Sequence, residues 1–453
     1  MDTIAIFDIG KTNKKFLLFD RDLRLVHQEE SVFEETTDED GFPCDDIDKI
    51  DNWMKDCILN PVISEKFSIK AINFCTYGAS VVYLGERGQR VAPLYNYLKP
   101  FPADVLYGFY EKYGGIDEFC RCTASPALGM LNLGLQILWL KKKKPEVFTN
   151  TRDILFFPQY LSYLFTGVVT ADETYVGCHT AVWDFDNQHY HKWLSDEGIK
   201  LPAPRSDSKV YDIIMGNYCF KSGIGIHDSA ASLVPYQQNS TEKFILVSTG
   251  TWCISMNPFN DEPLTFDQLR QDCLCNRSTD QRQIKSSRLF MGHIHDVNVN
   301  RLNEHFNVKP GFYKTVRLDR ELLARIRNEK RGKFFSNGIP GDYVDVQVDL
   351  SQFTNFDHAY HQLMFDLCNY VLNSIRLIIP KVDDGRDIYI TGGFARNEIF
   401  THLIAGGFPD KRVFISEVDN ASALGAAMVI YEGAFKTKVP AIDLGLKQFS
   451  ASL

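Results

Sequence analysis

Two short turns in this sequence carry the residue types that bind phosphate groups. The first follows the apolar run Ala5–Ile9 and contains Asp8, Gly10, Lys11, Thr12, Asn13 and Lys15. Glycine permits the tight bend, and backbone N–H groups at such a turn can cradle phosphate oxygens. A carboxylate is the oxygen ligand that Mg²⁺ prefers. We therefore expect a phosphate-binding turn with Asp8 as the magnesium ligand; the alternative is an ordinary β-hairpin with a polar tip.

The same plan returns in the second half of the chain. The segment Phe244–Met256 again places an apolar strand before a small polar turn, Thr249-Gly250-Thr251, and then a second strand. A repeat is informative because it constrains the whole architecture rather than one loop. Two such hairpins facing each other would form a nucleotide cleft between two related halves.

A carboxylate that could take a proton from a substrate hydroxyl lies before the middle of the chain. His227-Asp228 follows a glycine-rich approach and precedes the small-residue segment Ser229–Leu233. A carboxylate next to a His at a helix start is well placed to receive that proton, provided it lies within hydrogen-bond reach of the acceptor. Asp is also a very common N-cap residue, and the two roles are compatible.

Other loops follow buried-type strands. Strand Ile69–Cys75 runs into Thr76-Tyr77-Gly78, and open α/β sheets bind ligands where a strand runs into such a loop. Tyr97 lies in an aromatic, polar loop beyond it. Strand Ile388–Ile390 runs into Gly392-Gly393 and then Asn397, and this turn would let a flat ring approach the backbone closely.

Composition limits the class of protein. The chain has 453 residues, which favours two or three domains. Its net charge of −9 argues against a general nucleic-acid binder. The sequence contains no apolar run of about 18 residues, so we expect no membrane span.

The start of the chain and its cysteines indicate the cellular compartment. Met1-Asp2-Thr3 lacks the positive segment of a secretion signal. The odd count of 11 cysteines favours reduced thiols in the cytoplasm, and the pairs Cys120/Cys122 and Cys273/Cys275 are too closely spaced for a typical zinc site.

The elements expected around these motifs are mixed. Helical patterns cover 131–144 and 357–379, and a small-residue helix covers 421–428. A polar, non-periodic stretch at 237–242 suggests a boundary, so we divide the chain into domains 1–240 and 241–453. Residues 260–330 are rich in charge and remain unassigned.

Taken together and in this order, the motifs resemble those of the FGGY family of carbohydrate kinases, within the actin-like ATPase superfamily. The resemblance is carried by the following segments: Asp8–Lys15, Ser248–Trp252, Thr391–Asn397, Ala423–Ala427, Leu164–Gly167, and Trp139-Leu140 before Pro145-Glu146. It implies an α/β fold of two actin-like (ribonuclease H-like) domains, with a nucleotide and sugar cleft between them.

The resemblance also implies roles for individual residues. Asp228 would be the catalytic base, and Asp8 would hold Mg²⁺, mostly through water. Lys15 would stand where the family often has an Arg near the phosphates. The sugar would contact Thr76, Tyr77, Gly78, Tyr97, His227 and Asp228. ATP would contact Gly10, Lys11, Thr12, Asn13, Lys15, Thr249, Gly250, Thr251, Gly392, Gly393 and Asn397.

The implied activity is transfer of the γ-phosphoryl group from Mg·ATP to a hydroxyl of a ketose. Thr76-Tyr77-Gly78, His227–Ala230 and Gly250-Thr251-Trp252 most resemble family members that act on L-rhamnulose, while L-fuculose, L-ribulose and D-xylulose stay open. The expected partners are the sugar and Mg·ATP, without nucleic acid or membrane, in a cytoplasmic monomer or homodimer. Two alternatives are a non-catalytic sugar or nucleotide sensor and an ATPase that moves a protein partner.

Overall fold

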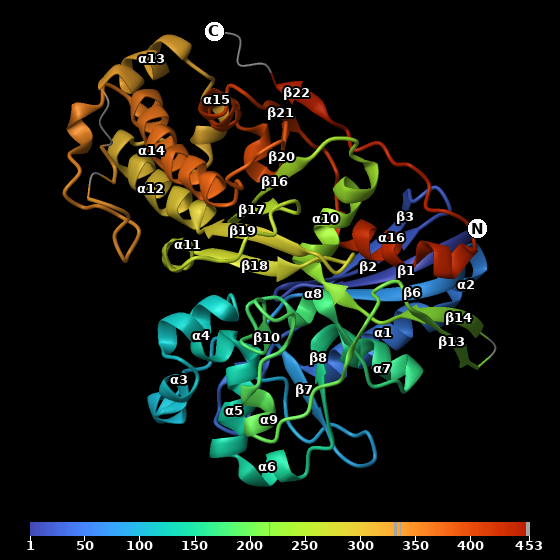
Figure 1. The fold of residues 1–453 in the computed structure, drawn as a ribbon. Helices are drawn as coiled ribbons and strands as arrows, with labels where there is room; N and C mark the ends of the chain where they lie inside the picture. The colour runs from blue at the N-terminus through green and yellow to red at the C-terminus, as the bar shows by residue number, and fades with distance from the viewer. Residues whose placement is uncertain (217, 330–332, 336, 450–453) are drawn as a thin grey trace.

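Two seven-stranded sheets dominate the computed structural model, which describes residues 1–216, 218–329, 333–335 and 337–449. In Figure 1 the first sheet crosses the middle of the molecule, and the second occupies the upper part. Shorter elements fill the region below the first sheet. The predicted α/β class is confirmed.

The first sheet is built around the predicted phosphate turn. Its order is β13-β14-β6-β1-β2-β3, with β15 pairing on β6. The strands are β1 (Asp2–Ile9), β2 (Asn13–Phe19), β3 (Leu25–Val32), β6 (Ser68–Thr76), β13 (Val210–Met215), β14 (Tyr218–Gly223) and β15 (Ile226–His227). Strand β1 runs antiparallel to β2 and parallel to β6. The centre of β1 is apolar throughout and buried, as expected for a strand covered on both faces.

The second sheet repeats this arrangement. Its order is β18-β19-β17-β16-β20-β21-β22. The strands are β16 (Phe244–Thr249), β17 (Cys253–Asn257), β18 (Cys273–Arg277), β19 (Gln283–Leu289), β20 (Asp387–Gly392), β21 (Arg412–Ile415) and β22 (Lys447–Phe449). Strand β16 is antiparallel to β17 and parallel to β20. The unit β2-β1-β6 therefore returns as β17-β16-β20, and the predicted repeat is confirmed.

Helices cover both faces of the first sheet. They are α1 (Ile47–Leu59), α2 (Pro61–Lys66), α7 (Phe157–Thr166), α10 (Asp228–Asn239) and α16 (Ala421–Phe435). In Figure 1, α10 and α16 lie above the sheet and α1 and α7 below it. Helix α16 contacts β6 and β1, although it comes from the far end of the chain.

Helix α10 packs against both sheets. Its residues Ala231 and Val234 join the buried cluster that contains β1 residues of the first sheet. Its residues Leu233 and Tyr236 join a different cluster with Phe244 of β16 and β20 residues of the second sheet. The helix that begins at Asp228 is therefore fixed from two sides.

The second sheet carries its own helices: α11 (Phe266–Arg270), α12 (Met291–Phe306), α13 (Arg320–Glu329), α14 (Phe356–Leu377) and α15 (Glu398–Gly407). Helix α14 confirms the helix expected over 357–379. The unassigned stretch 260–330 contains β18, β19 and helices α11 to α13, so its charges lie on a sheet edge and on helices rather than in one long loop.

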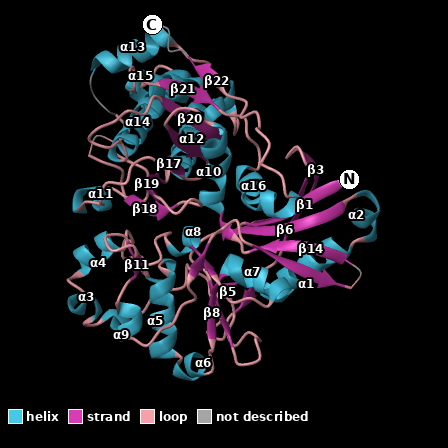
Figure 2. Ribbon diagram, turned by 45° about the vertical axis from the view of Figure 1, so that its right-hand side comes forward, coloured by secondary structure: helices cyan, strands magenta, loops and turns pink. Residues whose placement is uncertain are grey.

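A third group of elements lies below the first sheet. Its helices are α3 (Phe109–Lys112), α4 (Ile116–Cys122), α5 (Leu133–Lys143), α6 (Pro145–Thr149), α8 (Glu173–Val176) and α9 (Trp193–Asp196). Short strand pairs accompany them: β4 (Thr36–Thr37) with β5 (Pro43–Cys44), β7 (Val81–Leu84) with β8 (Asp153–Phe156), β9 (Ala171–Asp172) with β12 (Pro204–Arg205), and β10 (Trp183–Asp184) with β11 (His189–Tyr190). Figure 2 shows α3, α4, α5, α6 and α9 gathered in this region. Aromatic contacts hold it together, including Phe109 with Trp193 at 5.5 Å between ring centroids.

Within the part of the chain that the structure describes, no helix is both long enough and apolar enough to cross a membrane. All eleven cysteines carry free thiols, and all but Cys219 are buried.

Candidate active site

The turn between β1 and β2 has the tight geometry expected for it. The backbone N–H of Gly10 donates to the carbonyl of Asn13 at 2.9 Å. A Cβ atom at Gly10 would lie 2.9 Å from the same carbonyl oxygen, so a larger residue would distort the turn. Thr12 and Asn13 are exposed at its tip. The turn therefore leaves its polar groups available to a ligand.

Asp8 lies at the end of β1, in register with Lys15 of β2 and Cys75 of β6. Burial raises the pKa of its carboxyl to about 6, and the nearby charge of Asp228 adds to this, while Cys75 and Lys15 oppose it. Two carboxylates from distant segments thus meet closely enough to repel each other. Such a pair favours a bound cation.

Asp8 would not form a complete metal site by itself. The described residues contain no group of three or more His, Cys, Asp or Glu side chains that could hold a metal ion. Mg²⁺ usually keeps several waters and takes one or two protein carboxylates together with phosphate oxygens. Asp8 fits that mode of binding as the single protein carboxylate.

Lys11 points toward other acidic residues. Its Nζ lies 2.7 Å from Glu35 Oε1 and 2.7 Å from Asp45 Oδ2. Asp45 also pairs with the buried Lys14 at 2.9 Å and accepts a hydrogen bond from the Tyr77 hydroxyl. The charge of Lys11 is therefore already compensated, and a phosphate would have to compete with two carboxylates for it. Sequence reasoning could not foresee this because Glu35 and Asp45 lie in an irregular acidic stretch.

Lys15 has a different environment. Its Nζ donates to Asn420 Oδ1 at 3.1 Å, and Asn420 is the N-cap of α16. This hydrogen-bond partner is neutral, and although the Lys15 charge also acts on Asp8, it is less compensated than that of Lys11, which pairs with two carboxylates. Of the two predicted phosphate-binding lysines, Lys15 is thus the better placed.

The residues predicted to contact a sugar lie on the other side of Asp228. Thr76 ends β6 and pairs with His227 of β15. A Cβ atom at Gly78 would lie 3.0 Å from His227 Nε2, so only glycine leaves room for this imidazole. The rings of Tyr77 and Tyr97 lie 6.0 Å apart. The charges of Lys11, Asp45 and Asp228 all act on the Tyr97 hydroxyl, whose pKa is raised mainly by burial.

Asp228 is the first residue of α10, and His227 is the N-cap. The carboxylate is therefore not the N-cap that its sequence position also suggested. Its side chain is 32% exposed, and its Oδ1 lies 3.4 Å from His227 Nε2. The structure thus brings Asp8, Asp228, His227, Gly78 and Tyr97 into one neighbourhood, with Asp228 open to a ligand.

A second group of predicted residues surrounds a cavity of about 550 Å³ against the second sheet. Gly250, Thr251, Gly393 and Asn397 line it. Thr249 and Gly392 lie beneath: Thr249 Oγ1 donates to Thr391 O at 2.6 Å, and a Cβ atom at Gly392 would lie 1.9 Å from Thr249 O. The Asn397 side chain caps α15 and donates to the Tyr360 hydroxyl at 2.8 Å, so it also shapes the wall. A cavity of this size suits a small-molecule ligand.

Most other lining residues were missed because they come from the unassigned stretch. They are Gly292, His295, Asp296, Tyr313, Lys314, Val316 and Arg317, together with Phe394, Arg396 and Glu398. The N-terminus of α12 meets the turn at Gly250, where the Gly292 N–H donates to Thr251 O at 3.1 Å. A helix N-terminus and nearby cations suit an anionic ligand. The charge-rich stretch 260–330 offered no local pattern from which these residues could be found.

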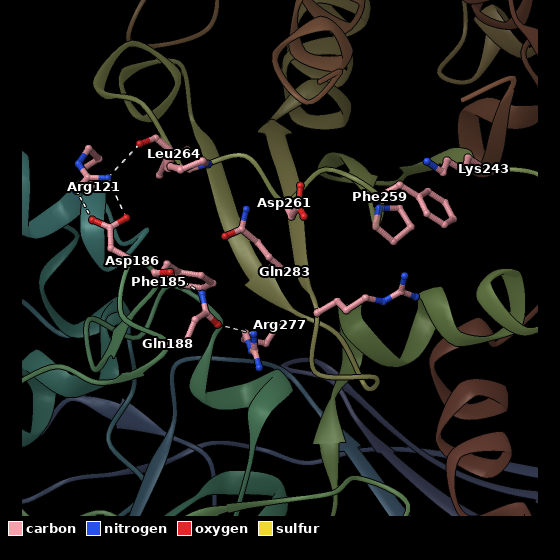
Figure 3. A pocket seen from close by; sticks show the side chains of 13 residues that line it. Arg121, Phe185, Asp186, Gln188, Lys243, Phe259, Asp261, Leu264, Arg277 and Gln283 are labelled. Carbon is pink, nitrogen blue, oxygen red and sulfur yellow. Dashed lines mark hydrogen bonds and ion pairs between the residues drawn. The ribbon is translucent and has the colours of Figure 1, made fainter. Parts of the chain in front are cut away.

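A different cavity, of about 660 Å³, contains none of the predicted residues (Figure 3). It lies where the lower helices approach the second sheet. Its guanidinium groups are already paired: Arg121 with Asp186, Arg277 with Glu173 of α8, and Arg282 with Asp280. The first two pairs join separate segments of the chain, whereas Arg282 and Asp280 lie two residues apart.

Comparisons with known proteins agree with this geometry. Residues 3–224 match the sequence profile of the FGGY family of carbohydrate kinases, N-terminal domain. Rhamnulokinase of Enterobacter sp. (strain 638) is 24% identical over 221 residues, and the aligned part covers 45% of this chain and 44% of that enzyme. The match therefore spans less than half the length of this curated relative.

Solved structures extend the likeness to the whole fold. A carbohydrate kinase from Novosphingobium aromaticivorans has a TM-score of 0.78 at 22% identity, covering 99% of this chain and 94% of that one. A ligand-bound xylulose kinase from Lactobacillus acidophilus has a TM-score of 0.78 at 16% identity, covering 99% and 93%. The two-sheet architecture is the one found in sugar kinases with the actin-like ATPase fold, as the motifs predicted.

Proposed function

We propose that this chain, whose residues 3–224 match the N-terminal domain of the FGGY family of carbohydrate kinases, transfers the γ-phosphoryl group of ATP to a hydroxyl of a small sugar. One observation carries the proposal. The partly exposed carboxylate of Asp228 lies beside His227, which packs on Gly78, and its charge acts on Asp8. A base is thus available between an acceptor site and a phosphate site.

We assign the two halves of this reaction to residues 1–240 and 241–453. The first would hold the sugar and the base, and the second would hold the nucleotide. The contact of α16 with the first sheet makes the C-terminal segment a structural part of the first half as well. Closure of the halves would exclude water and so suppress hydrolysis of ATP.

In this mechanism Asp228 accepts the proton of the sugar hydroxyl, and His227, Gly78, Thr76, Tyr77 and Tyr97 orient the sugar. Gly250, Thr251, Gly393 and Asn397 hold the nucleotide in their cavity. Thr249 and Gly392 shape that cavity from below. The turn Gly10–Asn13 and Lys15 approach the phosphates from the first sheet. Phosphoryl transfer depends on such positioning and on charge neutralisation.

Asp8 fits a magnesium ion carried in with ATP and held mostly through water. The raised pKa of Asp8 reports a repulsion that a dication would relieve. Bound Mg²⁺ would neutralise charge on the transferred phosphoryl group. Since the substrate is cellular ATP, we expect the protein to act in the cytoplasm.

For the sugar we propose a ketose, with L-rhamnulose first. The support is the match to rhamnulokinase of Enterobacter sp. (strain 638), at 24% identity over 221 residues. L-Fuculose, L-ribulose and D-xylulose follow in that order.

The test is a coupled ADP-release assay over these four ketoses and common aldoses. We expect one sugar to give ATP- and Mg²⁺-dependent turnover that EDTA abolishes. Asp228→Asn should lower that turnover by about 10² or more, because it removes the base, while ATP binding measured by calorimetry persists.

The outcomes separate the alternatives. Normal turnover by Asp228→Asn would refute the base assignment. Sugar and nucleotide binding without any transfer would instead indicate a sensor. ATP turnover that needs no sugar would indicate an ATPase that acts on a protein partner.

A further inference from the structure

A cysteine and two histidines meet next to Asp228. The Sγ of Cys178 lies 3.2 Å from His179 Nδ1 and 3.4 Å from His227 Nε2. The same His227 nitrogen lies 3.4 Å from Asp228 Oδ1. His227 thus lies between the Cys178 sulfur and the proposed base Asp228, and its ring packs against Gly78. Neither Cys178 nor His179 was predicted from the sequence.

The backbone that presents this cysteine adopts an uncommon conformation. His179 has φ 41° and Ala181 has φ 62°, both in the left-handed region that non-glycine residues avoid. The turn is held there because Asn132 donates to the His179 carbonyl at 2.8 Å and the Ser125 hydroxyl accepts from the Ala181 N–H at 2.9 Å. Strained backbone that is held by its surroundings is typical of functional sites.

Charge explains why these side chains can be buried together. Cys178 and His227 are each 5% exposed. Burial raises the pKa of the Cys178 thiol, but His179 and His227 outweigh burial and lower it to about 5. Burial likewise lowers the pKa of His227, but Cys178 and Asp228, with a smaller effect from Asp172, raise it to about 9. Tyr175, whose ring lies 5.7 Å from the His227 ring, completes the surroundings.

We propose that Cys178 is a positioning residue of this kinase, whose thiolate holds the His227 imidazolium against Asp228 and Gly78 at the sugar side of the site. This rests on the proposed phosphoryl transfer. The sulfur would fix the ring in one orientation, so that His227 meets the sugar and Asp228 keeps its place beside the acceptor hydroxyl. Loss of the sulfur atom would therefore weaken binding of the sugar more than binding of ATP.

The first experiment needs no catalysis. Thiolate formation is followed by ultraviolet absorbance between pH 4 and pH 9 in the full-length protein and in Cys178→Ser, both carrying Cys219→Ser to remove the exposed thiol. We expect a transition with a midpoint near pH 5 that Cys178→Ser lacks. Nine other thiols have a pKa raised by burial and stay protonated in this range: Cys44, Cys57, Cys75, Cys120, Cys122, Cys253, Cys273, Cys275 and Cys368. A protein with no such transition overturns the proposal.

The second experiment is kinetic. Cys178→Ala should raise the KM for the sugar about tenfold and leave the KM for ATP within about twofold. In the pH profile of kcat/KM for Cys178→Ala, the alkaline limb should move to lower pH by about one to three units. Burial still lowers the pKa of His227 in this variant, whereas the Cys178 charge that raises this pKa is gone. Cys178→Ser keeps a polar contact without the charge and should show the same pH shift.

Cys120→Ala is the matched control, because it removes an equally buried thiol from α4, outside this cluster. It should leave both KM values and the pH profile unchanged. Melting temperatures show whether each variant is folded. Cys178 variants that are folded and keep the native sugar KM and pH profile overturn the proposal. A wild type that forms the thiolate but phosphorylates no sugar refutes the proposed function and leaves the ion pair established.

Discussion

At the scale of single residues, Asp8 and Asp228 show how a site can oppose the stability of its own fold. Burial and the neighbouring carboxylate raise the pKa of Asp8 from 3.8 to about 6. The folded protein therefore holds the Asp8 proton more tightly than the unfolded chain does. It follows that the stability contributed by this group is full at low pH and is lost as pH rises toward and through 6.

This sign gives a prediction for Asp8→Asn. Since the amide cannot ionise, the variant should have a free energy of unfolding about 2 kcal/mol above the wild type at pH 8, and the difference should vanish near pH 4. The same variant should lose phosphoryl transfer. Denaturant unfolding at the two pH values measures the first effect. Asp22→Asn, which changes an exposed carboxylate, serves as the control. It should change neither the free energy of unfolding nor phosphoryl transfer. A variant less stable than wild type at pH 8 would contradict the argument.

Gly292 is the second residue at which a single atom matters. A Cβ atom there would lie 2.2 Å from Gly250 O and 2.9 Å from Thr251 Cα, which are backbone atoms that cannot turn away. Gly292→Ala should push the phosphate turn of the second sheet out of place and raise the KM for ATP about tenfold or more, with little effect on the KM for the sugar.

Gly341→Ala is the control for this variant, because a Cβ atom at Gly341 would meet only open space. Steady-state kinetics with each substrate varied in turn provide the measurement. An unchanged KM for ATP in Gly292→Ala would show that the turn does not hold the nucleotide.

At the scale of elements, the pair α10 and α16 connects the base to the rest of the fold. Helix α10 carries Asp228 at its first residue and packs against both sheets. Helix α16 presses on it so closely that a Cβ atom at Gly425 would lie 1.8 Å from Ala231 O. In addition, Asn73 Nδ2 of β6 donates to the Ala426 carbonyl at 2.9 Å. The position of the base thus depends on a helix almost two hundred residues later in the chain.

We therefore expect Gly425→Ala to separate the two helices. The variant should lose about 2 kcal/mol of stability, and kcat should fall while ATP affinity changes little, since the nucleotide cavity lies elsewhere. Glu432→Ala changes an exposed residue of the same helix and should be neutral. Thermal unfolding and kinetics together check this. A drop in stability with native kcat would show that α16 supports the fold but not the base.

At the scale of the whole molecule, ion pairs around the cavity of Figure 3 join the halves of the chain. Arg277 of β18 pairs with Glu173 of α8 and donates to Gln188 Oε1 at 2.6 Å. Arg121 of α4 reaches Asp186 and donates to the Leu264 carbonyl at 3.3 Å. These contacts lie between the lower helices and the second sheet, so they would resist any movement of one half against the other.

Arg277→Gln should loosen this connection. It leaves the largely buried Glu173 without its partner, which should cost about 2 kcal/mol of stability. The radius of gyration measured by small-angle X-ray scattering should increase in the absence of substrates and return on adding ATP and sugar. The KM values for both substrates should rise together.

Two comparisons make this test specific. Arg282→Gln changes an arginine of the same cavity that pairs only with Asp280, two residues away, and should leave the scattering unchanged. Adding Glu173→Gln to Arg277→Gln should recover part of the lost stability, because the unpaired charge is then removed. If both single arginine variants scatter alike, the Arg277 pair does not hold the halves together.

Local patterns were enough to predict much of this protein. The apolar runs before Gly10 and Gly250 specified two hairpins, and their repetition predicted two similar sheets. The helical pattern at 357–379 was correct within two residues at each end. The cavity residues Gly250, Thr251, Gly393 and Asn397 were found from glycine turns after strands. These features depend on residues close together in the chain, and backbone sterics and periodicity act over that range.

What the tertiary structure alone decided involves contacts between distant segments. The pairing of Lys11 with Glu35 and Asp45, the cavity wall from 292 to 317, the placement of α16 on the first sheet and the meeting of Cys178 with His227 have no local signature. A charged or sulfur-containing side chain takes its chemistry from its neighbours, through burial and nearby charge, and the fold chooses those neighbours. The sequence by itself therefore determined which turns could bind phosphate, whereas only the folded chain determined which ionisable groups face one another around the base.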